Sequence, residues 1–84
     1  MGGLLVRVSG ATAIGVVLKQ LRRQRAMTQE QIAVEAGLDR TYVSYLETGR
    51  RSPSLDTMLA LSTALHTPLA QIALLIEDRL NSDQ

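Results

Sequence analysis

The stretch Met27–Gly49, MTQEQIAVEAGLDRTYVSYLETG, has the pattern of two short helices joined by a tight turn. Thr28 is a good N-cap, and Gln31 three residues later completes a capping box. The helix that follows is expected to run to about Ala36. Gly37 can then adopt the left-handed conformation that commonly closes a helix.

The second half of the stretch repeats this pattern. Asp39 is expected to cap the next helix, which runs to about Thr48 and is stopped by Gly49. Only residues 37–39 connect the two helices. A connection this short prevents antiparallel packing along their length, so they must cross steeply, as in a helix-turn-helix.

Apolar periodicity predicts three further helices around this pair. The first begins at Thr12 and ends near Ala26, and Gly15 weakens it by roughly 1 kcal/mol relative to alanine. Ser54 caps another, and Pro68 opens the last. The expected inward stripes are Ile14, Val17, Leu18 and Leu21 in the first, Leu55, Met58, Leu59, Ser62 and Leu65 in the second, and Leu69, Ile72, Ala73, Ile76 and Leu80 in the last.

The expected fold class is therefore all-α, with five helices in one domain over residues 12–80. Residues 1–11 form an N-terminal arm that dimer contacts could order, and residues 81–84 form a tail. Within the arm, residues 4–8 could form a short strand, and a frayed segment is the alternative.

Composition excludes several classes of protein. The 84 residues include no cysteine and one histidine, which excludes disulfides, thiolate metal sites and paired-histidine sites. No catalytic or phosphate-loop motif occurs, so we expect neither an enzyme nor a cofactor or metal. No run without a polar side chain exceeds six residues, the length of residues 13–18, which is too short to cross a membrane, and the N-terminus lacks a signal-peptide pattern. We expect a cytoplasmic protein.

The net charge of +1 is unevenly distributed. Residues 19–51 hold seven basic and four acidic side chains, whereas residues 52–84 hold one basic and four acidic side chains. This asymmetry indicates that the basic half, which contains the two-helix stretch, is the working surface.

The helix after Gly37 has a distinctive outward face. Val43 and Leu46 define its buried direction, so Thr41, Ser44, Tyr45 and Thr48 point most nearly away from the core, with Arg40, Tyr42 and Glu47 on the flanks. Tyr42 and Tyr45 are the only aromatic residues in the chain. Their position on one helix indicates a contact surface more than core filling.

Residues 27–61, MTQEQIAVEAGLDRTYVSYLETGRRSPSLDTMLAL, resemble the Cro/phage-repressor helix-turn-helix family, and the similarity extends from about Val17 to Leu69. The resemblance implies a lambda-repressor-like domain that binds double-stranded DNA sequence-specifically and regulates transcription. Residues 39–47 would be the recognition helix in the major groove. The positions that stand where family members contact bases are Arg40, Thr41, Ser44 and Tyr45.

Other residues are candidates for the DNA backbone. Thr28 and Gln29 lie in the first turn of a helix, where unpaired N–H groups favour an anion. Arg50 and Arg51 follow the recognition helix, and Tyr42 could either contact a phosphate or pack on the preceding helix. The resemblance also implies a structural ion pair between Arg22 and Glu47.

The last helix is the candidate dimer interface. Leu74 and Leu75 fall outside its inward stripe and should leave an apolar patch in a monomer. We expect a homodimer through Ile72, Leu74, Leu75 and Ile76, and the alternative is that these leucines pack on the N-terminal arm. Two-fold pairing would place two recognition helices about 34 Å apart on a pseudo-palindromic operator.

Narrower functions remain open. Residues 38–44, LDRTYVS, are similar to the controller proteins of restriction–modification systems. An antitoxin that represses its own operon with a protein partner is equally compatible. A protein–protein interaction module that has lost DNA binding is a third possibility, and Gln29, Arg40, Arg50 and Arg51 argue against it.

Overall fold

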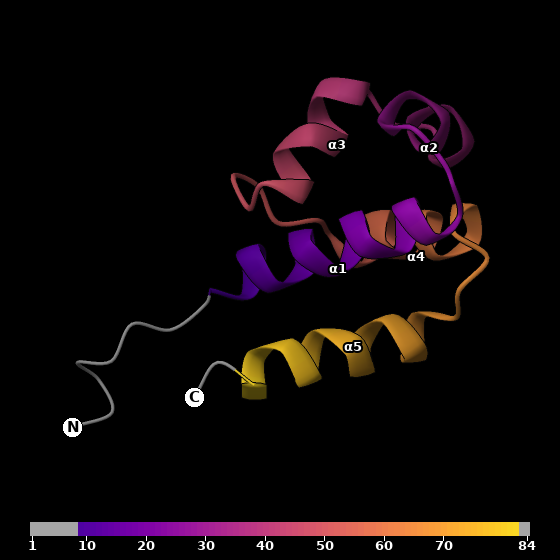
Figure 1. Ribbon diagram of the computed structural model, residues 1–84. Helices are drawn as coiled ribbons and strands as arrows, with labels where there is room; N and C mark the ends of the chain where they lie inside the picture. Colours follow the sequence, from indigo (N-terminus) through magenta and orange to yellow (C-terminus); the bar gives the residue numbers. More distant parts are fainter. Residues whose placement is uncertain (1–8, 83–84) are drawn as a thin grey trace.

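The computed structural model describes residues 9–82, which form five α-helices (Figure 1). They are α1 (Gly10–Gln24), α2 (Gln29–Ala36), α3 (Arg40–Glu47), α4 (Leu55–Ala64) and α5 (Leu69–Ser82). No strand occurs among these residues, so the predicted all-α class is confirmed. Most of the expected arm, including the possible strand at residues 4–8, lies outside the described residues.

Two helix ends differ from expectation. α1 begins at Gly10, two residues before Thr12, because the Ser9 hydroxyl caps it and accepts the Thr12 N–H at 3.1 Å. α5 continues to Ser82, into the expected tail.

No single helix within residues 9–82 is both long and apolar enough to cross a membrane; α4 and α5 pass that test only as a pair bent by 107°.

The caps of α2 and α3 were predicted with one exception. The Thr28 hydroxyl accepts the Gln31 N–H at 3.0 Å, and the Gln31 side chain accepts the Thr28 N–H at 2.8 Å. Gly37 closes α2 with a φ of 70°. Asp39 is the N-cap residue of α3, as predicted, but its side chain makes no cap hydrogen bond; its exposed carboxylate can be hydrated instead. α2 and α3 cross steeply, as expected (Figure 1).

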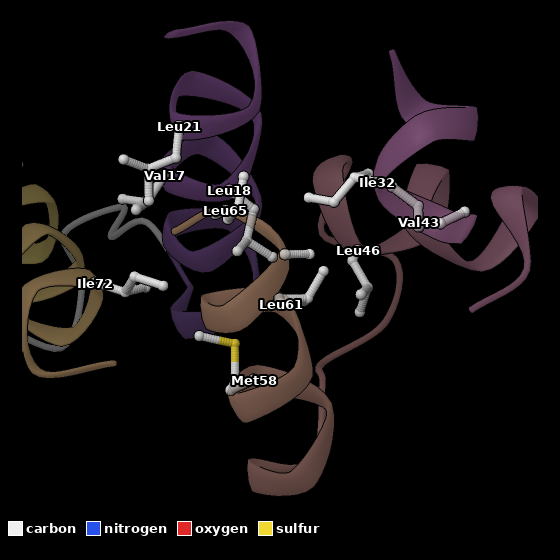
Figure 2. Close-up of a cluster of buried hydrophobic side chains, with 12 residues drawn as sticks. Val17, Leu18, Leu21, Ile32, Val43, Leu46, Met58, Leu61, Leu65 and Ile72 are labelled. Carbon is white, nitrogen blue, oxygen red and sulfur yellow. The ribbon is translucent and has the colours of Figure 1, made fainter. Parts of the chain in front are cut away.

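α1 lies at the centre of the packing. It contacts α3 on one side and α5 on the other, while α2 packs against α3 and α4. α5 consequently lies across α1 from the helix-turn-helix (Figure 1). The core joins all five helices (Figure 2), and its fully buried large side chains are Val17, Ile32, Leu46, Leu61, Leu65 and Ile72.

The buried face of α4 differs from the predicted one. Met58 and Leu65 are buried as predicted, but Leu61 and Ala64 are buried as well, and Leu55 and Leu59 are exposed, at 66% and 46% of their surface. Because α4 carries apolar residues on two faces, periodicity could not distinguish them. Packing against α2 and α5 selects the face that contains Leu61. A smaller error occurs in α5, where the predicted inward alanine at position 73 is exposed.

Gly15 allows α1 to approach the end of α3 closely. A Cβ atom at this position would lie 2.4 Å from the Leu46 carbonyl oxygen and 2.6 Å from that of Glu47. Both distances are far shorter than a van der Waals contact. The sequence indicated only the helix-weakening effect of this glycine. The structure adds that this glycine lets the end of α3 lie directly against α1.

Candidate nucleic-acid interface

α3 buries one face and leaves the other open. Val43 and Leu46 are 2% and 1% exposed, which confirms the predicted buried direction. On the other side Thr41 is exposed, and Ser44 and Tyr45 are half-buried. Arg40 is exposed at the N-terminal end of the helix. Of the four residues expected to contact bases, Arg40 and Thr41 are therefore exposed, and Ser44 and Tyr45 are partly accessible.

A buried ion pair fixes α3 to α1. Arg22 Nε donates to Glu47 Oε2 at 2.6 Å, and Nη2 donates to Oε1 at 3.0 Å, which confirms the predicted pair. Arg22 Nη1 also donates to the Met27 carbonyl at 2.8 Å, so the loop before α2 is held by the same guanidinium. The hydrogen bond to Glu47 raises the pKa of Arg22 above its ordinary value. Burial acts in the opposite direction, but its effect is smaller. This bidentate geometry fixes the angle of α3.

The pair has a further member that the sequence did not reveal. Gln29 Nε2 donates to Glu47 Oε1 at 3.0 Å. Since an amide carries two N–H donors, one remains for the predicted DNA phosphate. The spacing between Gln29 and Glu47 gave no periodic signal, because the contact depends on how α2 crosses α3. Glu47 thus links the first turn of α2 to α1.

The other candidates for the DNA backbone lie on both sides of α3. Thr28 is exposed at the N-terminus of α2. Tyr42 is half-buried and packs against the hydrophobic core; its predicted alternatives were a phosphate contact and packing on the preceding helix. Arg50 and Arg51 are exposed in the loop after α3. The two arginines thus lie at the end of α3 that carries Tyr45.

The loop after α3 folds back onto the helix. Gly49 has a φ of 77°, and the N–H groups of Arg50 and Arg51 both donate to the Tyr45 carbonyl, at 2.9 and 3.3 Å. A Cβ on Gly49 would lie 2.9 Å from Thr12 Oγ1, so α1 also requires glycine there. The sequence predicted the helix stop at Gly49 but not this contact. The loop thereby places two arginines beside Tyr45.

The exposed leucines of α5 belong to a helix that packs on the other side of α1 from α3. Leu74 and Leu75 are 60% and 36% exposed, and Ile76 is half-buried. Ile72 is fully buried and forms part of the core (Figure 2). Its assignment to a dimer interface is wrong, because its side chain is fully buried within the core of the single chain. The apolar surface that remains centres on Leu74 and Leu75.

Comparisons with known proteins agree with this geometry. The helix-turn-helix family matches residues 18–72. Control protein C.MunI from a Mycoplasma species is 38% identical over 59 residues, which make up 69% of this chain and 80% of that protein. The immunity repressor of Bacillus phage phi105 is 37% identical over 59 residues, but these are only 41% of its length.

Solved structures extend the comparison. The restriction–modification controller protein C.AhdI from Aeromonas hydrophila is 37% identical, with a TM-score of 0.72 over 74% of this chain and 94% of that one. The controller C.Esp1396I, solved as a tetramer with its natural 35 base-pair operator, shares the fold with a TM-score of 0.81 at 23% identity, over 88% of this chain and 97% of that one. This chain belongs to the helix-turn-helix family of the Cro and phage-repressor type.

Proposed function

We propose that the protein is a dimeric, sequence-specific regulator of transcription that inserts α3 into the major groove of double-stranded DNA. One observation carries this proposal. The polar face of α3 is accessible while the helix is held from behind by the buried Arg22–Glu47 pair. A rigid helix with an open polar face is what direct reading of base edges requires.

The side chains divide between two tasks. Arg40 can pair bidentately with guanine, while Thr41 and Ser44 offer hydroxyl groups to base edges, and the Thr41 methyl group suits thymine. Thr28, Gln29, Tyr42, Arg50 and Arg51 position the protein on the phosphates. This division is supported by their placement, since Arg40 and Thr41 are exposed at the start of α3. Thr28 and Gln29 lie at the start of α2, and Arg50 and Arg51 lie in the loop after α3.

Dimerisation supplies the specificity that one helix lacks. Each mismatched base pair costs only about 1–3 kcal/mol, so one short helix discriminates weakly. Pairing through Leu74, Leu75 and Ile76 would double the base contacts on a pseudo-palindromic operator. The exposed leucines support this assignment, and so does the position of α5 away from α3, which leaves the DNA-facing side free.

Within this function, a restriction–modification controller is the subclass we favour. C.MunI and C.AhdI are matched over 80% and 94% of their own lengths, whereas the phage immunity repressor is matched over 41%. A controller acts on DNA by binding and needs no catalytic group, and it would work in the cytoplasm. Neighbouring genes for a methyltransferase and an endonuclease would support this subclass, and a neighbouring toxin gene would favour the antitoxin alternative.

A gel-shift experiment on fragments of the source genome tests the proposal. We expect a small set of fragments to be retarded at protein concentrations that leave bulk DNA free. Thr41→Ala with Ser44→Ala should abolish this selection while leaving the protein folded, because neither side chain is part of the core. Exposed Lys19→Ala, on α1, is the matched control and should keep the selection. If no fragment is bound more tightly than bulk DNA, even at low salt, the result would favour the protein–protein module instead.

A further inference from the structure

Two arginine side chains lie close to the ring of Tyr45 at the end of α3. The Arg50 Cζ lies 4.7 Å from the ring centroid, and the Arg51 Cζ lies 5.9 Å from it. Both distances fall within the range in which a cation is attracted to an aromatic face, and the attraction is stronger at the shorter one. Tyr45 therefore contacts Arg50 more strongly than Arg51.

The backbone tethers the same three residues. The Tyr45 carbonyl accepts the N–H groups of both arginines, and Gly49 provides the chain reversal that brings them back over the helix. Arg50 is consequently held at two points, at its backbone by the Tyr45 carbonyl and at its guanidinium by the Tyr45 ring. The open C-terminal end of α3 also favours positive charge.

Building on the proposed function, we propose that Tyr45 is a positioning residue whose ring holds Arg50, and more weakly Arg51, ready for a DNA phosphate. A free arginine samples many rotamers, and fixing one of them on binding costs entropy. A ring that already holds the guanidinium lowers that cost. Tyr45 thus raises the affinity for every DNA sequence.

This role differs from the base contact that the sequence indicated for Tyr45. One face of the ring lies against Arg50, so that face is not free to stack on or beside a base. Base choice then rests on Arg40, Thr41 and Ser44. The two roles differ in what they need from the side chain. Positioning needs the ring, whereas a hydrogen bond to a base needs the hydroxyl.

Two substitutions separate these needs. Tyr45→Phe keeps the ring and removes the hydroxyl, and Tyr45→Leu removes the aromatic face. Binding is measured by fluorescence anisotropy at several salt concentrations on two short duplexes, the tightest binder selected from a randomised pool and an unrelated sequence. We expect Tyr45→Phe to bind like the wild type. Tyr45→Leu should bind roughly three- to tenfold more weakly to both duplexes, with a shallower dependence on salt.

Combination with arginine variants tests the coupling itself. In an Arg50→Ala background, Tyr45→Leu should have almost no further effect, because the guanidinium that it positions is gone. In an Arg51→Ala background most of the effect should remain, since that guanidinium is farther from the ring. Thermal melts by circular dichroism should show all variants folded.

Three results would overturn the inference: equal losses for Tyr45→Phe and Tyr45→Leu, no loss for Tyr45→Leu, or an undiminished loss in the Arg50→Ala background. If the wild-type protein binds neither duplex, the proposed function fails and this inference fails with it. That outcome is recognised before any variant is compared, so the two failures are distinguishable.

Discussion

Replacing Gly15 with alanine places a methyl group where the end of α3 already lies. The new Cβ would be 2.4 Å from the Leu46 carbonyl oxygen, 2.6 Å from that of Glu47 and 2.8 Å from the Glu47 carbonyl carbon. All three atoms belong to the backbone, so no side-chain rotation relieves the contact. Reaching ordinary contact at 3.4 Å requires a displacement of about 1 Å.

The expected loss of stability follows from two opposing effects. Overpacking of this kind costs up to about 3 kcal/mol, and alanine returns roughly 1 kcal/mol through its higher helix propensity. The net loss is about 2 kcal/mol, which lowers the Tm of a domain this size by roughly 8–16 °C.

Thermal and urea unfolding followed by circular dichroism measure this loss directly. Gly10→Ala is the matched control, since Gly10 lies in the same helix and a Cβ there meets nothing within 4 Å. That variant should be as stable as the wild type or slightly more stable. If Gly15→Ala also gained stability, the close seating of α3 on α1 would be refuted.

Three further predictions concern the ion pair, the DNA contacts and the dimer. Glu47→Gln leaves a buried guanidinium without its counter-charge and should lower the free energy of unfolding by about 3 kcal/mol in urea titrations; an unchanged midpoint would contradict the anchoring role. Arg40→Ala should weaken binding at one or two base pairs, whereas Arg50→Ala should weaken it on all sequences and reduce the salt slope by about one; competition assays giving the reverse pattern would exchange their roles. Leu74→Glu with Leu75→Glu should give monomers in ultracentrifugation, and a persistent dimer would move the interface elsewhere.

Local signals predicted the helix-turn-helix well. The capping box at Thr28 and the left-handed Gly37 are interactions between residues close in sequence, so residue types alone determine them. The same holds for the cap at Ser54. The Arg22–Glu47 pair joins distant residues, and it was predicted only through resemblance to a family.

Contacts between helices explain what the sequence could not give. α4 has leucines on two faces, and only packing against its neighbours selected Leu61 over Leu59. The sequence indicated only that Gly15 weakens its own helix. The α3 backbone that it accommodates lies more than twenty residues away in the chain, so no local pattern pointed to that contact. The position of Tyr45 beneath Arg50 likewise depends on a chain reversal at Gly49 whose direction no spacing rule predicts.

Methylation interference on a selected operator tests the central claim most directly. Dimethyl sulfate modifies guanine N7 in the major groove and adenine N3 in the minor groove, so it reports which groove the protein occupies. If α3 reads the major groove in a dimer, modified guanines should block binding in two patches about one helical turn apart. Interference confined to adenines, or absent at every guanine of the site, would contradict the account.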